Sequence, residues 1–232
     1  MPAGDNAGIV FFRDCAVMNF RLAAAALAAL LSAGLLYAEE TAPVAKAQVD
    51  NTPKMAYGLM MKQGEKLVFS PCRDPSYAFV EDVSTDAALT AALNSLGLDQ
   101  GKRLYVELLG IFDGATLKAS SVNMARVEGR CQLPGGKEES WRAAGNDPAW
   151  ALVAGGEDVQ LRRYGQPEVV VPYAAFRTEG KVTRYEGSKN NNRLSVRFEK
   201  TLCHDSEAKG IFAWTATVDI NGQLLKGCAW AR

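Results

Sequence analysis

Four cysteines carry the clearest chemical signal in this 232-residue sequence. Cys72, Cys131, Cys203 and Cys228 all follow an apolar segment of the kind that directs export, so they would meet an oxidising compartment. We expect the bridges Cys72–Cys131 and Cys203–Cys228, one in each half of the chain, although four cysteines allow three connectivities. The sequence has no C-x-x-C pair, and its one histidine, His204, directly follows a cysteine. This spacing favours structural disulfides over a redox or metal-binding role.

The segment Cys203-His204-Asp205-Ser206 contains the residue types of a hydrolytic triad. Three consecutive residues cannot point at one another as a Ser-His-Asp triad requires. We therefore expect a surface loop that Asp205 and Ser206 hold through bonds from their side chains to the backbone. A hydrolase that uses Asp205, His204 or carboxylates in turns is the alternative function.

Three methionines near the start of the mature chain suggest a second alternative. Met55, Met60 and Met61 offer the soft thioether ligands that Cu(I) prefers, which would suit a copper-sensing or envelope-stress module. Methionines in such a position more often fill a core. We predict no bound metal and no cofactor. The chain also lacks a glycine-rich phosphate loop, and its paired carboxylates lie in turns, so we predict a protein that is not an enzyme.

Aromatic residues are concentrated in the second half of the chain. They would either close the core of a β-barrel or form a surface for a ligand or a partner. A turn at Asp147-Pro148 directly precedes Trp150, and the loop at His204 and Asp205 lies beside a cysteine. We expect a candidate partner surface that comprises Trp150, Asp147, His204 and Asp205.

The charge balance excludes some classes of partner. Lys plus Arg number 26 and Asp plus Glu number 26, which gives a formal net charge of +0. A neutral chain has no electrostatic footprint for nucleic acid and no long-range attraction to anionic membranes. The expected partner is an envelope protein or a small ligand.

Export is predicted from the apolar run at 22–36, LAAAALAALLSAGLL, with Arg21 just before it. The run has the length of the hydrophobic region of a signal peptide and is short for a membrane span. Cleavage after Ala38 would make 1–38 the signal peptide, and Met18 is better placed than Met1 to begin it. We expect a periplasmic protein with no stable membrane span after cleavage. An uncleaved anchor is the alternative.

The elements that must position these residues are mostly short β-strands. Residues 39–54 are polar and aperiodic and are typical of a flexible tether. We expect a first β-rich domain with one helix at 55–135, a boundary at Pro134-Gly135-Gly136-Lys137, and a second all-β domain at 138–232. The predicted fold class is mainly β with a minor α component: two small antiparallel barrels or sandwiches, each with one disulfide.

Local patterns place the individual elements. The single helix is predicted between Ser84 as N-cap and Gly97 as C-terminal stop. The strand at 103–112 is apolar on both of its faces and should be covered on both. Asn221-Gly222 is the strongest hairpin signal. The other strands are predicted at 66–70 and 121–131 in the first half, and at 149–154, 159–164, 168–173, 181–185, 193–202, 213–220 and 223–230 in the second.

Three short motifs suggest a family. They are Gly145-x-Asp147-Pro148-x-Trp150, Cys203-x-Asp205, and the closing Leu225-x-Gly227-Cys228-Ala229. With them the chain resembles an uncharacterised family of proteobacterial periplasmic proteins and lipoproteins with two β-rich halves. The first half is similar in style to the amino-terminal domain of the envelope-stress lipoprotein NlpE. The family loop Gly-Met-Ser-Asp is replaced here by His204–Lys209, and the lipobox cysteine of many relatives is missing, so neither a loop function nor a lipid anchor carries over.

The expected function follows from export, two bridges and neutral charge. It is an exported, non-enzymatic binding or envelope-maintenance protein. A specific form is an inhibitor-like barrel that docks an envelope-acting enzyme such as a lysozyme through the loop at 204–210.

Overall fold

The computed structural model describes residues 51–127, 130–131 and 139–232. The predicted signal peptide and the predicted boundary at Pro134-Gly135-Gly136-Lys137 lie outside these residues. The first element within the described residues begins at Lys54, at the end of the predicted tether.

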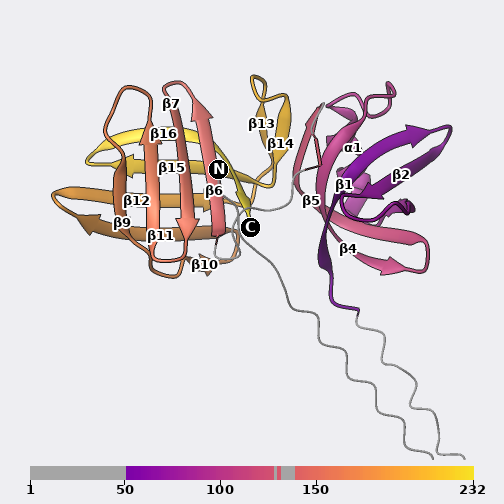
Figure 1. Ribbon diagram of the computed structural model, residues 1–232, viewed down its shortest axis with the longest axis horizontal. Helices are drawn as coiled ribbons and strands as arrows, with labels where there is room; N and C mark the ends of the chain where they lie inside the picture. Colours follow the sequence, from indigo (N-terminus) through magenta and orange to yellow (C-terminus); the bar gives the residue numbers. More distant parts are fainter. Residues whose placement is uncertain (1–50, 128–129, 132–138) are drawn as a thin grey trace, which may run out of the picture. The chain divides into compact units, whose positions relative to one another are not determined.

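β-strands dominate the described residues, which confirms the predicted fold class. Two sheets are present, and Figure 1 shows their strands. The first sheet contains β1 (Lys54–Gln63), β2 (Lys66–Pro71), β3 (Ala78–Asp82), β4 (Leu104–Asp113), β5 (Thr116–Val127), β13 (Cys203–Asp205) and β14 (Gly210–Phe212). The second contains β6 (Glu139–Asn146), β7 (Ala149–Gly155), β8 (Asp158–Arg163), β9 (Val169–Pro172), β10 (Arg177–Glu179), β11 (Val182–Lys189), β12 (Asn192–Glu199), β15 (Trp214–Ile220) and β16 (Gln223–Ala231).

The first five strands close into a barrel. Their order is β1-β2-β3-β5-β4, and β4 pairs with both β5 and β1, so no edge is left between them. The pair β3–β5 is parallel, whereas the other pairs of this barrel are antiparallel. The helix lies between the third and fourth strands of the chain, and the parallel pair joins the third and fifth.

The single predicted helix is present but short. A 3₁₀ turn at Thr85–Ala87 precedes α1, which spans Ala88–Asn94. The Ser84 hydroxyl accepts the Leu89 N–H at 3.0 Å, and the Asp82 carboxylate accepts the Thr90 N–H at 2.7 Å. These side chains satisfy two of the amides that the first helical turn leaves without partners.

The second sheet curls so that its two ends are linked. Its order is β10-β11-β12-β15-β16-β6-β7-β8-β9. The Tyr185 hydroxyl on β11 donates to the carbonyl of Pro172 on β9 at 2.6 Å. Phe176 packs between these strands, with its ring 5.0 Å from Tyr185 and 5.7 Å from Phe198. Most aromatics of this half therefore close a core, and Tyr164 is an exception with 89% exposure.

A hairpin from the second half of the sequence extends the first sheet. Figure 1 shows β13 and β14 beside β5, and the register pairs Phe212 with Met124. The bridge Cys203–Cys228 joins this hairpin to β16 with Cα atoms 5.5 Å apart. The bridge Cys72–Cys131 has a Cα separation of 5.3 Å, so both predicted pairings are confirmed.

Strand β4 is buried on both faces, as its sequence predicts. Leu104, Val106 and Leu108 point into the barrel core. On the opposite face Tyr105 packs in a small third core that also contains Phe212 and Cys228.

A buried ion pair lies on this second face. Glu107 is 0% exposed, and its Oε1 lies 3.0 Å from Nη1 of Arg232, whose side chain is 6% exposed. The Tyr105 hydroxyl donates to Oε1 of Glu107 at 3.0 Å, and the Asn123 amide donates to Oε2 at 2.8 Å. Asn123 also donates to the carbonyl of Ala231 and accepts its N–H. The carboxylate thus has a cation and two neutral donors, which is the compensation a buried charge requires.

Removal of one charge from this pair tests how much the pair contributes to the free energy of unfolding. Glu107→Gln leaves the Arg232 guanidinium buried without its counter-charge, so we expect the free energy of unfolding to fall by roughly 3–5 kcal/mol. Urea denaturation measures this. The control is Glu199→Gln, which breaks the exposed 2.7 Å pair with Arg197 and should cost less than about 1 kcal/mol. Equal losses in the two variants would contradict the assignment.

Stability should also fall at high pH because of Tyr105. Burial, followed by the charge of Glu107 and the hydrogen bond to it, raises the pKa of Tyr105 above its usual range. Above about pH 10 the unfolded tyrosine loses its proton while the folded one keeps it. The unfolded state then binds fewer protons, and stability falls as pH rises. In urea unfolding between pH 8 and 11, we expect Tyr105→Phe to lose stability less steeply than wild type, and Tyr164→Phe to follow wild type; parallel profiles for all three would rule this out.

Candidate functional site

A crevice lies where three distant segments of the chain meet beside the Cys203–Cys228 bridge. Its volume is about 380 Å³. The turn between β6 and β7 contributes Asn146 and Asp147, the start of the β13–β14 hairpin contributes residues 203–207, and β16 contributes residues 226–228. We call this hollow the bridge crevice.

Close approach of β6 and β16 forms its floor. Cys228 pairs with Ala144 in this register. A Cβ atom on Gly227 would collide with the carbonyl of Ala144, and one on Gly145 would collide with the carbonyl of Lys226 and with the indole of Trp150. Only glycine fits where the backbones come this near. The Trp150 indole N–H can therefore donate to the Lys226 carbonyl at 3.0 Å.

Asp205 holds the hairpin against the neighbouring turn. Its Oδ1 accepts the Asn146 side-chain amide at 2.9 Å and the backbone N–H of Ala208 at 2.8 Å. The second bond is the side-chain-to-backbone contact that the sequence predicts for this residue. With the disulfide, these bonds fix both ends of the loop that forms the rim.

The structure brings together three of the four residues of the predicted partner surface. Asp147, His204 and Asp205 all line the bridge crevice, and His204 and Asp147 are exposed. Trp150 lies below the crevice, is 4% exposed and belongs to the core of the second sheet. It supports the floor instead of presenting its ring to a partner.

The sequence patterns did not identify Asn146 and Lys226, whereas Glu207 lies in the loop at 204–210 that they predicted to dock a partner. Lys226 follows the buried Leu225 along β16 and shares a face with the exposed Leu224, and this period of two could have identified it as an outward residue. The ion pairs found in the described ranges use neither Asp147, Glu207 nor Lys226. Two carboxylates, one ammonium and an imidazole are thus available to a partner.

A catalytic role for His204 has no support in the local geometry. Asp205 uses its Oδ1 for the two bonds that hold the hairpin. None of the hydrogen bonds within residues 51–127, 130–131 and 139–232 involves the His204 imidazole. A hydrolytic site needs a base hydrogen-bonded to its nucleophile.

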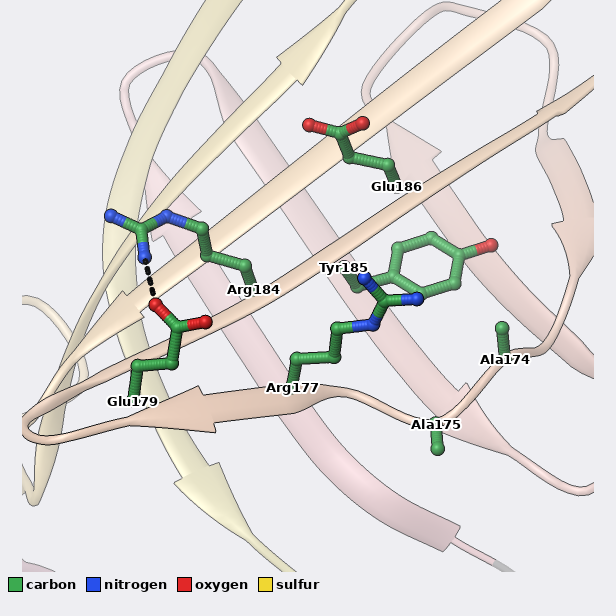
Figure 2. A pocket seen from close by; sticks show the side chains of 7 residues that line it. All are labelled: Ala174, Ala175, Arg177, Glu179, Arg184, Tyr185 and Glu186. Atoms are coloured by element: carbon green, nitrogen blue, oxygen red, sulfur yellow. Dashed lines mark ion pairs between the residues drawn. The ribbon is translucent and has the colours of Figure 1, made fainter.

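A second hollow lies beside β10 and β11, with a volume of about 480 Å³. Figure 2 shows its charged side chains: Arg184 pairs with Glu179 at 3.9 Å, while Arg177 and Glu186 project without a drawn ion pair. All four are exposed. Opposite charges on an exposed sheet face are well solvated, so this hollow has weaker claims than the bridge crevice.

The three methionines of the copper alternative do not converge. Met60 is fully buried in the barrel core, whereas Met61 faces outward from the next position of β1. Met55 and Met61 share a face but are six residues apart, which is about 20 Å along a strand. In the described part of the chain, no group of three or more His, Cys, Asp or Glu is placed to hold a metal ion.

Comparisons with known proteins add no assignment. No protein-family model, no curated protein sequence and no solved structure matches the chain. The family resemblance and the similarity to NlpE therefore stay predictions. Within the ranges that the structure describes, no helix has the length and apolar character needed to cross a membrane.

The role of Asp205 in shaping the crevice can be measured by hydrogen exchange. Asp205→Ala removes both bonds from Oδ1, and one lost bond to a charged group costs about 1.5 kcal/mol or more. We expect the Ala208 amide to exchange about tenfold faster or more. Ser206→Ala is the matched control, since Ser206 is exposed and adjacent. Unchanged exchange in Asp205→Ala would show that the hairpin is held without this carboxylate.

Proposed function

We propose that this chain is an exported, non-enzymatic binding protein of the periplasm that docks an envelope protein at the bridge crevice. The observation that carries the proposal is the convergence of Asp147, His204 and Lys226 from three segments at one rim. The side chain of Asn146 meets Asp205 across 59 residues, and Trp150 meets Lys226 across 76. Such long-range closure around an exposed polar hollow fits a binding surface.

The rim is fixed before any partner arrives. Cys203–Cys228 and the bonds of Asp205 restrain the hairpin, and the indole of Trp150 restrains β16. A preformed rim loses little conformational entropy on binding, which favours affinity. Export is supported by the two disulfides, which persist in oxidising compartments.

The charge of the rim favours a partner of mixed polarity. Asp147 and Glu207 are available as acceptors and Lys226 as a donor, so complementary charges on the partner would set orientation and association rate. An inhibitor-like form of this function has the loop at 204–210 entering the substrate cleft of an envelope-acting enzyme such as a lysozyme. A small polar ligand in the crevice is the other form.

Affinity capture from envelope extracts tests the proposal. The mature protein serves as bait beside the crevice variant Asp147→Ala/His204→Ala/Lys226→Ala. The matched control is Arg177→Ala/Glu179→Ala/Glu186→Ala, which removes three exposed charges from the hollow of Figure 2. We expect a partner quantified by mass spectrometry to be lost from the crevice variant and kept by the control.

Capture that is equal on all three baits would overturn the proposal. Loss only with the control variant would move the site to the hollow on β10 and β11. The inhibitor-like form has its own assay, in which a molar excess of wild-type protein should lower lysozyme activity and the crevice variant should not. Full lysozyme activity at large excess removes that form and leaves the capture result to decide the rest.

A further inference from the structure

The hollow of Figure 2 lies beside the connection between β9 and β10, the two end strands of the second sheet. It has no part in the proposed function. Its volume of about 480 Å³ would hold a small molecule, and Ala174 and Ala175 of the connection line one side of it. Four charged side chains of β10 and β11 also line it: Arg177, Glu179, Arg184 and Glu186. We call it the charged hollow.

Strand pairing sets the positions of these four charges. Arg177 lies directly opposite Arg184, and Glu179 and Glu186 lie two residues further along their own antiparallel strands. Residues two apart share a face, so all four belong to the same face of the sheet. Each glutamate is thus diagonal to the arginine of the other strand, with about 7–8 Å between the two residues. One diagonal is closed, because Oε2 of Glu179 lies 3.9 Å from Nη1 of Arg184.

The other diagonal, from Arg177 to Glu186, is open. Strand β10 begins at Arg177, so Glu186 lies beside the connection and has no opposite residue on β10. The short side chains of Ala174 and Ala175 leave the space there unfilled. None of the ion pairs among the described residues includes Arg177 or Glu186. The guanidinium and the carboxylate are therefore both available to a ligand.

Two further arginines lie near Glu186 but do not line the hollow. Arg193 and Arg197 of β12 are diagonal to Glu186 on its other side. Arg197 pairs with Glu199 at 2.7 Å, and Arg193 is exposed. The sheet face around the hollow therefore alternates in charge. A ligand of one sign would meet like charges there, whereas a ligand that carries both signs can satisfy Arg177 and Glu186 together.

The walls of the charged hollow are held in place from beneath. The ring of Phe176 stacks on that of Tyr185 at 5.0 Å, and the Tyr185 hydroxyl donates to the Pro172 carbonyl at 2.6 Å. These contacts anchor the connection near both of its ends. The hydroxyls of Thr178 and Thr183 are hydrogen-bonded at 2.9 Å and join β10 to β11. A hollow that is formed in advance loses little conformational entropy when a ligand binds.

We propose that the charged hollow binds a free α-amino acid as its zwitterion. The ligand carboxylate accepts hydrogen bonds from the Arg177 guanidinium, which can bind a carboxylate through two parallel N–H groups. The ligand ammonium donates to the carboxylate of Glu186. Both ligand groups are attached to one carbon atom, so two hydrogen bonds of about 2.8 Å let a single amino acid bridge the open diagonal. The side chain of the ligand then lies over Ala174 and Ala175.

The ligand also offsets an unfavourable feature of the sheet. Like charges directly opposite each other on neighbouring strands are destabilising, and Arg177 and Arg184 are in that position. Glu179 offsets the charge of Arg184, and a ligand carboxylate offsets that of Arg177. This site is separate from the bridge crevice and does not depend on it.

Titration of the ¹⁵N-labelled mature protein, followed by NMR, tests the proposal. The probes are alanine, leucine, glutamate and lysine, and the single-charge controls are acetate and methylammonium. We expect at least one amino acid to shift the amide resonances of residues 174–186 with a dissociation constant of about 1 mM or tighter. Acetate and methylammonium should bind about tenfold more weakly or worse, since each satisfies only one of the two charges. Comparison of the four amino acids identifies the preferred side chain.

Variants locate the binding. Arg177→Gln and Glu186→Gln each remove one charge at an exposed position and should weaken the affinity about tenfold or more. The matched control is Arg162→Gln, which breaks the exposed 2.7 Å pair with Glu168 on another part of the second sheet and should bind as wild type does. The crevice variant should also keep its affinity for the amino acid, which separates this site from the proposed function.

Three results would each overturn the proposal. They are no binding of any of the four amino acids, binding of acetate or methylammonium as tight as that of the amino acids, and binding that either charge-removing exchange leaves unchanged. The spectra of the free variants report whether each is folded. If one exchange disturbs the fold, the other decides the outcome, since the two charges lie on different strands.

Discussion

The buried pair Glu107–Arg232 is the constraint on which the two-sheet arrangement depends. A carboxylate with 0% exposure on the outer face of a barrel strand is costly unless charge and hydrogen bonds compensate it. The compensating guanidinium comes from a residue 125 positions later. Asn123 adds two bonds to the backbone of Ala231 across 108 residues. The charge of the first sheet therefore has its counter-charge only when the residue after β16 of the second sheet is in place.

The same junction creates the bridge crevice. The β13–β14 hairpin belongs to the second half of the sequence but pairs with β5 of the first sheet. A disulfide links it to β16. Between hairpin and strand, the glycines at 145 and 227 let the backbones approach and leave room above them. Polar side chains then gather at a rim whose position follows from strand pairing. A hollow between the β2–β3 connection and the β4–β5 turn, in contrast, is lined entirely by residues of the first barrel.

Local patterns predicted much of this structure. The two-sided apolarity of β4, the Asn221-Gly222 hairpin and both disulfide pairings are present, because each depends on short-range sequence or on order along the chain. The strand β1 was missed since it contains a glycine, which is needed where the Phe69 ring approaches. The pairing of β13 and β14 with the first sheet could not be predicted from the local sequence, because strands of three residues are too short to show a period. Three of the four residues of the predicted partner surface lie together at the bridge crevice, whereas Trp150 is buried below it, since a Trp after a turn does not reveal which face it occupies.

The pairing of the β13–β14 hairpin with the first sheet affects the order of folding during synthesis. A ribosome releases residues 54–127 long before residues 203–232, so the first barrel emerges with the β5 edge unpaired at Met124 and Ala125. Its outer face at Tyr105 and Glu107 is also uncovered until the end of the chain has been made, because Cys228 and Arg232 contact it. Unpaired strand edges and exposed apolar faces invite aggregation. The nascent protein therefore carries a vulnerable surface from the completion of the first barrel until the last thirty or so residues are made.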